Sequence, residues 1–278
     1  MLSYRHGFHA GNFADVFKHF ILVYLLNKLK ASKPFSFIDP FAAAGKYSIE
    51  DPFMNKNKEY SNGISKVLNA DISDPLIKNY LDLVRKTNPN KQGNKMVIYP
   101  GSCFLAQLAL DQDDYIYLSD LHNNEFEILK KNFEDDSRIV IEKKDAYASL
   151  DKMITSYQGT RLVLIDPSYE LKNEYDKICK LIKHNAGQFP GVCFLVWYPI
   201  LEAEKTSDFV KQFIDLKIIN TTNIHIELKN TFLRMQGTGF FIINAPSTMQ
   251  KDIVPSLDIL LHILKDPDHF AKINYNVF

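Results

Sequence analysis

Glycine is scarce in this chain, with 11 residues among 278, and cysteine is scarcer still, with three. Cys103, Cys179 and Cys193 stand far apart and form no Cys-x-x-Cys pair, which argues against a disulfide framework or a zinc site. The turn of small residues that follows the first predicted strand contains one glycine, Gly45, so it does not form a Gly-x-Gly-x-x-Gly motif. Because NAD and FAD are bound through several glycines at such a turn, we expect the chain to bind neither cofactor.

Long apolar runs and an excess of either charge are also lacking. The longest apolar stretch, Phe20 to Leu26, is far too short to span a bilayer, and the N-terminus shows no secretory signal pattern. The net charge is zero, but residues 1–33 carry five lysines and arginines against one acid, and residues 54–98 carry eight against four. We therefore expect a soluble, cytoplasmic protein with no metal and no membrane partner, whose two basic segments are candidates for contact with phosphate.

Apolar periodicity alternates between strand and helix along most of the chain. A helix with an apolar stripe is predicted across residues 12–30, with Asn12 as its N-cap. Strands are predicted at residues 35–38, 115–118, 139–141, 162–165 and 192–197, and helices at 104–110, 124–132, 148–154, 174–183 and 209–216. Two more strands, 224–228 and 239–244, are predicted to pair as a hairpin before a last helix at 257–264. This pattern indicates an α/β fold whose mostly parallel sheet is covered on both faces and ends in an antiparallel hairpin.

Residues 47–97 interrupt this alternation. They are dense in Asn, Lys, Asp and Pro and contain two short helical patterns, at residues 64–68 and 76–84. We expect them to form a mostly helical insertion in a single domain that spans residues 1–278. The Pro100-Gly101 turn after the insertion, with Ser102 at the cap position, predicts the start of the next helix.

Acidic residues stand where three successive strands end. Asp120, Asp145 and Asp166 follow the strands predicted at 115–118, 139–141 and 162–165. Ligands of open α/β sheets bind beyond the carboxyl ends of the strands, so we expect these carboxylates to share a ligand site. One carboxylate suits the hydroxyls of a ribose, and the next, with the N–H of Ala146, suits an adenine ring. This division of roles fits S-adenosylmethionine, which has a ribose and an adenine but no phosphate.

The last of these acids opens the sequence Asp166-Pro167-Ser168-Tyr169. Asp166 and the carbonyl of Pro167 are suited to accept the two N–H groups of an exocyclic amine, and Tyr169 offers a flat face for a base. Such acceptors favour attack of the amine nitrogen on a sulfonium methyl group, and Asp166 is the natural acceptor of the proton. The base must then be single-stranded or flipped out of its helix. The structural alternative is a strand end followed by a turn.

The same four residues resemble motif IV of the amino-methyltransferases, Asp/Asn-Pro-Pro-Tyr/Phe. The chain as a whole is similar to the bacterial 23S ribosomal RNA adenine-N6 methyltransferase J family. The resemblance extends over essentially the whole chain and is carried by Ser3-Tyr4-Arg5-His6, His9-Ala10-Gly11-Asn12, Ala14-Asp15-Val16, Lys18-His19, Tyr99-Pro100-Gly101-Ser102, Asp166-Pro167 and Trp197-Tyr198-Pro199. It implies a Rossmann-like class I methyltransferase that uses S-adenosylmethionine as cofactor and 23S ribosomal RNA as substrate.

The resemblance also implies roles for single residues. The catalytic element would be Asp166 with Pro167 and Tyr169. Tyr4, His6 and Lys18 would contact the RNA. The cofactor would be bound by seven residues that follow strand ends or lie on helices: His19, Phe41, Ser102, Asp120, Asp145, Ala146 and Asp166. Periodicity alone, in contrast, predicts Lys18 as a surface lysine and His19 as a residue at the edge of the apolar stripe.

Three positions depart from the family pattern. Phe41 stands where the family has histidine, Ala43 replaces a glycine, and Ser168 replaces the second proline of the motif. Since a residue before proline is conformationally restricted, Ser168 leaves Pro167 freer than it would be in the family. We expect these changes to slow the chemistry without abolishing it.

Two other functions stay open at this point. A non-catalytic nucleic-acid-binding protein on a decayed methyltransferase fold would explain the three departures. An adenine-N6 methyltransferase that acts on DNA, or a role in the use of external DNA, would use similar residues. The retention of Asp120, Asp145, Asp166 and Tyr169 favours an active enzyme, and the basic segments look too small for a separate DNA-reading domain. The sequence has no exposed apolar heptad that would indicate an obligate partner, so we expect a monomer.

Overall fold

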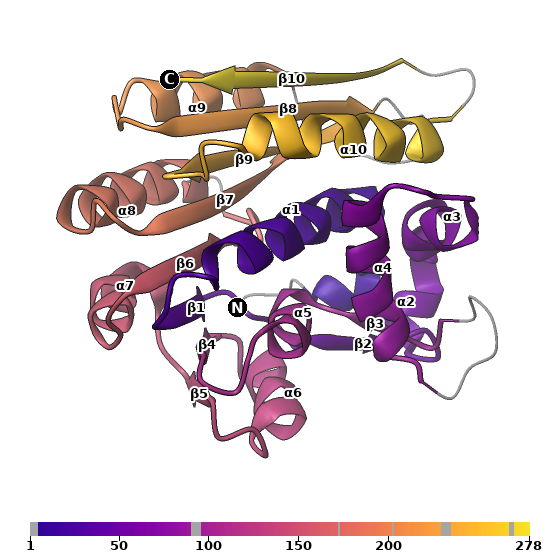
Figure 1. Cartoon of the computed structure of the whole chain (residues 1–278), viewed down its shortest axis with the longest axis horizontal. Coiled ribbons are helices and arrows are strands. Elements are labelled where there is room, and N and C mark those ends of the chain that lie inside the picture. The colour runs from indigo at the N-terminus through magenta and orange to yellow at the C-terminus, as the bar shows by residue number, and fades with distance from the viewer. Residues whose placement is uncertain (1–4, 90–95, 172, 202, 229–234, 267–269) are drawn as a thin grey trace.

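A sheet of eight strands runs through the centre of the molecule (Figure 1). The structure is a computed structural model that describes residues 5–89, 96–171, 173–201, 203–228, 235–266 and 270–278. The strand order is β10-β8-β9-β7-β6-β1-β4-β5. The strands are β1 (Phe35–Asp39), β4 (Tyr115–Ser119), β5 (Ile139–Glu142), β6 (Thr160–Ile165), β7 (Cys193–Ile200), β8 (Thr221–Leu228), β9 (Gly237–Ile243) and β10 (Ala271–Val277). Strands β5, β4, β1, β6 and β7 pair in parallel, and β9, β8 and β10 join them in antiparallel pairs. The α/β fold predicted from the sequence is confirmed.

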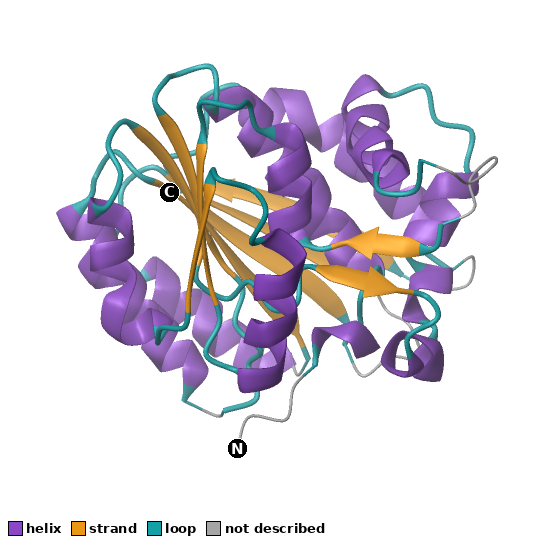
Figure 2. Cartoon of the chain, turned by 90° about the horizontal axis from the view of Figure 1, so that it is seen from below, coloured by secondary structure: helices purple, strands orange, loops and turns teal. Residues whose placement is uncertain are grey.

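Helices cover both faces of the sheet, as the edge-on view shows (Figure 2). In the central strand β6, Leu162 and Leu164 pack into one core cluster, and Val163 and Ile165 into the other. The first cluster includes residues of α1 (Phe13–Leu29), α5 (Ser102–Ala109), α6 (Asn123–Phe133) and α10 (Met249–Leu264). The second includes residues of α7 (Ala146–Thr155), α8 (Glu174–Gln188) and α9 (Ala203–Ile214). Burial on both faces explains why the parallel strands are almost uninterrupted apolar runs.

The first long helix, α1, is buried on all sides. Every residue from Phe13 to Leu26 is buried, because the helix lies between the sheet and the helices α5, α10 and α4 (Pro75–Lys86). Asn12 is its N-cap as predicted, and its side-chain oxygen accepts a hydrogen bond from the Asp15 N–H at 3.0 Å. The predicted apolar stripe with a polar edge is therefore wrong: the polar residues of α1 are enclosed as well.

A short antiparallel ladder brackets the segment that interrupts the βα alternation. Strand β2 (Lys46–Ser48) pairs with β3 (Ile98–Pro100). Between them lie α2 (Pro52–Asn57), the 3-10 helix η2 (Glu59–Asn62), α3 (Ile64–Asn69) and α4. The helical patterns at residues 64–68 and 76–84 are confirmed, whereas the two three-residue strands were not predicted because they are too short to show a period. Another 3-10 helix, η1 (His6–Phe8), precedes α1.

Several element ends differ from the prediction. Gly101, not Ser102, is the N-cap of α5, and Ser102 is its first helical residue. Strand β7 continues through Pro199 to Ile200, because β9 pairs with it as far as Ile200. Helix α10 begins at Met249 and has Pro255 inside it. Strand β10, which pairs with β8, was not predicted at all. No helix among the described residues is long and apolar enough to cross a membrane.

Candidate active site

The carboxyl ends of four neighbouring parallel strands carry acids. Asp39 ends β1, Asp120 and Asp166 directly follow β4 and β6, and Asp145 lies just beyond β5. Since parallel strands end at the same edge of the sheet, these acids converge on one cavity. Asp120, Asp145 and Asp166 line it, and Asp39 lies behind its wall, bonded to the lining residue Ser102. The clustering predicted for three of the acids is confirmed, and Asp39 is an addition.

Asp120 and Asp145 hold the loops that form the cavity floor. Asp120 accepts hydrogen bonds from the N–H groups of Ala43, at 3.0 Å, and His122, at 2.7 Å. Burial raises the pKa of Asp120. Asp145 caps α7 by accepting from the Tyr147 N–H at 2.9 Å. Ala146 is the first residue of that helix, so its N–H has no intrahelical acceptor. The carboxylates are thus fixed, and each oxygen keeps a second lone pair for a ligand.

Two aromatic side chains form an apolar part of the cavity lining. Phe41 and Tyr147 both line the cavity and meet edge to face, with ring centroids 5.7 Å apart. Phe41 therefore gives the cavity an apolar ring that neither donates nor accepts a hydrogen bond. The neighbouring Ala43 has a φ of +48°, in the left-handed region that favours glycine. The cavity combines an aromatic surface with fixed acceptors, as an adenosine group requires.

A chain of charged contacts links α1 to Asp166 of the Asp-Pro motif. Nε2 of His6 lies 2.9 Å from Asp15. The ammonium of Lys18 lies 2.8 Å from the other Asp15 oxygen and 2.6 Å from Asp166. Burial alone would raise the pKa of Asp15, but the charges of His6 and Lys18 hold it well below its usual range. Burial would likewise lower the pKa of Lys18, but the two carboxylates raise it, so the lysine stays charged.

Lys18 and His19 are both buried, so the surface and edge positions that periodicity predicts for them are wrong. His19 lines the cavity, and its Nδ1 lies 2.7 Å from the hydroxyl of Tyr99. Burial lowers the pKa of His19 to about 3, with Lys18 adding to the effect. The imidazole is therefore neutral at physiological pH. Tyr80, 3.1 Å from the Tyr99 hydroxyl, completes a buried polar group that the sequence pattern did not reveal.

Asp39 is the acid that sequence reasoning missed. It is fully buried, and its carboxylate accepts hydrogen bonds from the Ser102 hydroxyl at 2.6 Å and the Phe41 N–H at 3.2 Å. Burial raises the pKa of Asp39 to about 7, and the nearby Asp166 adds to the rise. A signal was present in the sequence, because Asp39-Pro40 ends its strand in the same way as Asp166-Pro167.

The motif itself lies in an irregular segment that follows β6. Pro167 is buried, and Tyr169 has a φ of +54°, which a non-glycine residue adopts only under constraint. The Tyr169 hydroxyl donates to the carbonyl of Trp197 at 2.6 Å, and its ring packs against Tyr175 with centroids 4.7 Å apart. As the structural alternative expects, β6 ends at Ile165. Residues 166–170, however, form no hydrogen-bonded turn, and Asp166 lines the cavity.

A second cavity, with a volume of about 850 Å³, adjoins the first. Of the residues that the structure describes, four line both cavities: His6, Lys18, Asp166 and Ser168. Tyr169 and Trp197 line the second one alone. Asp166 therefore stands at the junction, in reach of one ligand on each side.

The sequence-predicted site residues are brought together almost completely. Among the cavity-lining residues are all seven that were predicted to bind the cofactor: His19, Phe41, Ser102, Asp120, Asp145, Ala146 and Asp166. Of the residues predicted to contact RNA, His6 and Lys18 lie at the junction of the two cavities. The third, Tyr4, lies outside the described residues.

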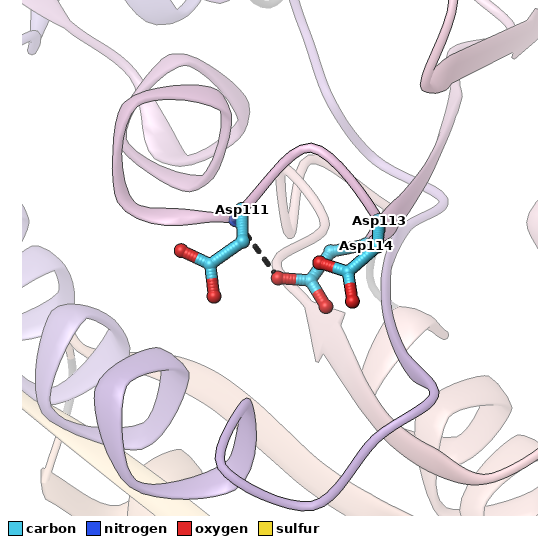
Figure 3. Close-up of side chains that lie close together, drawn as sticks. All are labelled: Asp111, Asp113 and Asp114. Carbon is cyan, nitrogen blue, oxygen red and sulfur yellow. Dashed lines mark hydrogen bonds between the residues drawn. The ribbon is translucent and has the colours of Figure 1, made fainter.

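A separate acidic cluster lies in the loop between α5 and β4 (Figure 3). Oxygens of Asp111, Asp113 and Asp114 lie within 4.8 Å of one another. The ammonium of Lys33 contacts all three carboxylates, and Lys30 contacts Asp111 as well. The carboxylates already share a cation, so this cluster gives no reason to assign a metal. It also shows that lysines of the basic segment 1–33 are paired with acids of the body.

Comparison with known proteins agrees with this geometry. Two curated proteins named ribosomal RNA large subunit methyltransferase J are similar over most of the chain. The protein from Haemophilus influenzae is 31% identical, covering 92% of this chain and 93% of its own. The protein from Escherichia coli is 30% identical, covering 91% and 90%. A crystal structure of protein LPL1258 from Legionella pneumophila superposes with a TM-score of 0.85 at 28% identity, covering 97% of this chain and 98% of that one.

The family model described as ribosomal RNA large subunit methyltransferase D, RlmJ, matches residues 32–277. That range contains β1 to β10 and the acids of both cavities except Asp15. The resemblance noted in the sequence, the α/β fold and the paired cavities thus agree. The chain belongs to the RlmJ family of ribosomal RNA large subunit methyltransferases.

Proposed function

We propose that this protein transfers a methyl group from S-adenosylmethionine to the N6 amine of an adenine in 23S ribosomal RNA. The observation that carries the proposal is the position of Asp166, whose carboxylate borders both the cavity of fixed acids and the larger second cavity. Family membership and the similarity to two ribosomal RNA methyltransferases support the same substrate class.

The first cavity suits S-adenosylmethionine. Asp120 and Asp145 supply acceptors for ribose hydroxyls and the adenine amino group, and the Ala146 N–H can donate to a ring nitrogen. Phe41 supplies an apolar surface. When bound there, the cofactor would supply an electrophilic sulfonium methyl group. The departure at Phe41 removes one polar contact, which we expect to weaken cofactor binding without preventing it.

The chain's own residues prepare the amine. Asp166 and the Pro167 carbonyl would accept the two N–H groups of adenine N6, which moves electron density onto the nitrogen and stabilises the positive charge that develops there. Asp166 would then take the proton. Lys18 holds the Asp166 carboxylate in place at 2.6 Å, and Asp15 and His6 hold Lys18. The target base must leave its helix to reach this position, as in other enzymes that act on single bases.

The test measures cofactor binding and transfer separately. Calorimetry with S-adenosylmethionine is followed by transfer of labelled methyl groups to protein-free 23S RNA. We expect wild type to bind and transfer, and Asp166→Asn to bind the cofactor but transfer at least about 10²-fold more slowly. Asp258→Asn, an exposed acid on α10 that lines neither cavity, is the matched control and should behave as wild type.

Other outcomes separate the alternatives. Binding without transfer to RNA, but with transfer to single-stranded DNA, would favour the DNA methyltransferase. A protein that binds RNA but shows no affinity for the cofactor at millimolar concentration would be the decayed form and would end the proposal.

A further inference from the structure

The proposed function names no residue that stacks on the target base, and Trp197 lines the cavity that would receive it. It is the single tryptophan of the chain, it is partly exposed, and it lines the second cavity from strand β7. Its indole N–H donates to the hydroxyl of Thr238 on β9 at 2.7 Å. This bond fixes the orientation of the ring and satisfies its one polar group, so the ring serves the cavity as an aromatic surface.

The same ring lies beside the carboxylate of the Asp-Pro motif. The ammonium of Lys18 is 2.6 Å from Asp166 and 5.6 Å from the centroid of the Trp197 ring. The carboxylate of Asp166 and the indole of Trp197 thus both border the second cavity, and the ammonium of Lys18 lies near both groups. A purine that places its exocyclic amine on Asp166 must extend from that carboxylate into the second cavity, alongside Trp197.

Tyr169, which the motif suggests as the stacking surface, is less suited to that task. Its hydroxyl is bonded to the Trp197 carbonyl, and its ring packs at 4.7 Å against Tyr175 and edge-on at 5.7 Å against Trp197. The hydrogen bond holds the strand of Trp197, and the edge-on contact packs against its ring. Tyr169 is therefore better placed to support the tryptophan than to receive a base.

The charge of the second cavity favours a base over a phosphate. Its volume of about 850 Å³ is ample for a nucleoside. Its described lining residues include six acids, Asp15, Glu59, Asp166, Glu170, Asp176 and Asp208, which outnumber the two lysines, Lys18 and Lys205, and the two histidines, His6 and His9. Such a lining is unfavourable for a phosphate group and offers acceptors to the amino groups of a base.

We propose that Trp197 is the stacking platform for the target adenine, and that Thr238 is the positioning residue that holds its ring. The inference rests on the proposed function and adds the residue that receives the base. Stacking on an aromatic ring contributes about 1–3 kcal/mol per base. Loss of the platform should therefore reduce RNA affinity by about 5- to 150-fold and leave cofactor affinity unchanged.

Because Trp197 is the single tryptophan, its fluorescence reports on the platform without any substitution. Wild-type protein is first saturated with S-adenosylhomocysteine, which fills the adenosine part of the first cavity. We expect this step to leave the fluorescence almost unchanged, because Trp197 does not line that cavity. Adenosine is then titrated, and we expect it to quench the fluorescence. Ribose, the control without a base, should not.

Three variants give an independent readout. Trp197→Phe keeps an aromatic face and should stay within a few-fold of the wild-type KM for RNA. Trp197→Leu fills similar space without a π face and should raise KM by at least fivefold, with calorimetry showing unchanged cofactor binding. Thr238→Val should raise KM less than Trp197→Leu, because the ring remains but loses its anchor.

The outcomes distinguish failure of this inference from failure of the proposed function. Cofactor binding and methyl transfer with no quenching by adenosine, and a wild-type KM for Trp197→Leu, would overturn the role of Trp197 alone. Quenching by S-adenosylhomocysteine itself would also overturn it, because the tryptophan would then belong to the cofactor site. Absence of cofactor binding would instead overturn the proposed function.

Discussion

At the scale of single residues, Ala43 stands out because its backbone is strained. Its φ of +48° lies in the left-handed region, which costs a residue with a Cβ about 1–2 kcal/mol. Glycine would remove that strain, although it gains more conformational freedom in the unfolded chain. We expect Ala43→Gly to raise the free energy of unfolding by about 0.5–1 kcal/mol in urea denaturation.

The adjacent Ala42 gives the control for that prediction. It is buried and is not among the residues of positive φ, so glycine brings there the entropic cost and the loss of a buried methyl group, with no strain to relieve. Ala42→Gly should lower the free energy of unfolding by about 1–2 kcal/mol. If both variants are destabilised to the same extent, the strain assigned to Ala43 is wrong.

The buried Asp39 makes stability depend on pH. Its folded pKa of about 7 is higher than its unfolded value, so the folded protein binds more protons between about pH 4 and pH 7. This group therefore contributes a loss of stability as pH rises through that window. Asp39→Asn is similar in shape and cannot ionise. We expect the free energy of unfolding of Asp39→Asn, relative to that of wild type, to rise by about 2–3 kcal/mol between pH 5 and pH 8.

Urea denaturation at the two pH values checks this directly. His19 changes stability in the opposite sense, because its folded pKa of about 3 is below its unfolded value and stability rises with pH up to about 6.5. It is present in both proteins, so the difference between wild type and Asp39→Asn removes its effect. A difference that does not change with pH would contradict the raised pKa of Asp39.

Some site residues could be predicted from sequence and others could not. Asp120, Asp145 and Asp166 were found because an acid at a strand end is visible locally, and parallel strands end together. The burial of Lys18 was not predictable from periodicity, because its partner Asp166 is 148 residues away. The role of Trp197 depends in the same way on contacts across the sheet, with Lys18 and Thr238.

At the scale of elements, α1 carries a buried ion pair in a helix that is otherwise core. Asp15 and Lys18 are spaced i, i+3, with side chains that are 3% and 4% exposed. Removing one partner of a buried pair leaves the other charge poorly compensated. Lys18 keeps Asp166, so we expect Asp15→Asn to lower the free energy of unfolding by about 2–4 kcal/mol.

Helix α4 offers a matched pair on the surface. Asp82 and Arg85 have the same i, i+3 spacing, with side chains 60% and 42% exposed. Asp82→Asn should change stability by less than about 0.5 kcal/mol, since exposed ion pairs are screened by water. Both variants are measured by urea denaturation at pH 7. Similar effects of the two substitutions would mean that burial does not determine the strength of the α1 pair.

Most long elements were predictable, and the short or peripheral ones were not. The parallel strands were found from their apolar runs, because burial on both faces makes such runs long and uninterrupted. The ladder of β2 with β3 has three residues in each strand and so lacks a readable period. Strand β10 does alternate, with Ile273, Tyr275 and Val277 separated by polar residues. It lies at the edge of the sheet, where a strand can form with only a weak apolar pattern.

At the scale of the whole molecule, the fold brings distant segments to one junction. Asp166 follows β6, Lys18 comes from α1, and Trp197 comes from β7. Residues that follow β1, β4 and β5 close the first cavity, while α1, α9 and β7 contribute to the second. Transfer of a methyl group from a cofactor to a base requires that both ligands lie close together. The carboxylate of Asp166 borders both cavities, so it can lie between the two ligands.

Transfer of a methyl group to adenine N6 is tested most directly by identifying the methylated nucleoside. Protein-free 23S RNA is incubated with the protein and labelled S-adenosylmethionine, digested to nucleosides, and separated by chromatography with mass detection. We expect the label to appear as N6-methyladenosine and to disappear with Asp166→Asn. Label in a methylated pyrimidine or in a ribose 2′-hydroxyl would contradict this expectation, because neither offers an adenine amine to Asp166 and the Pro167 carbonyl.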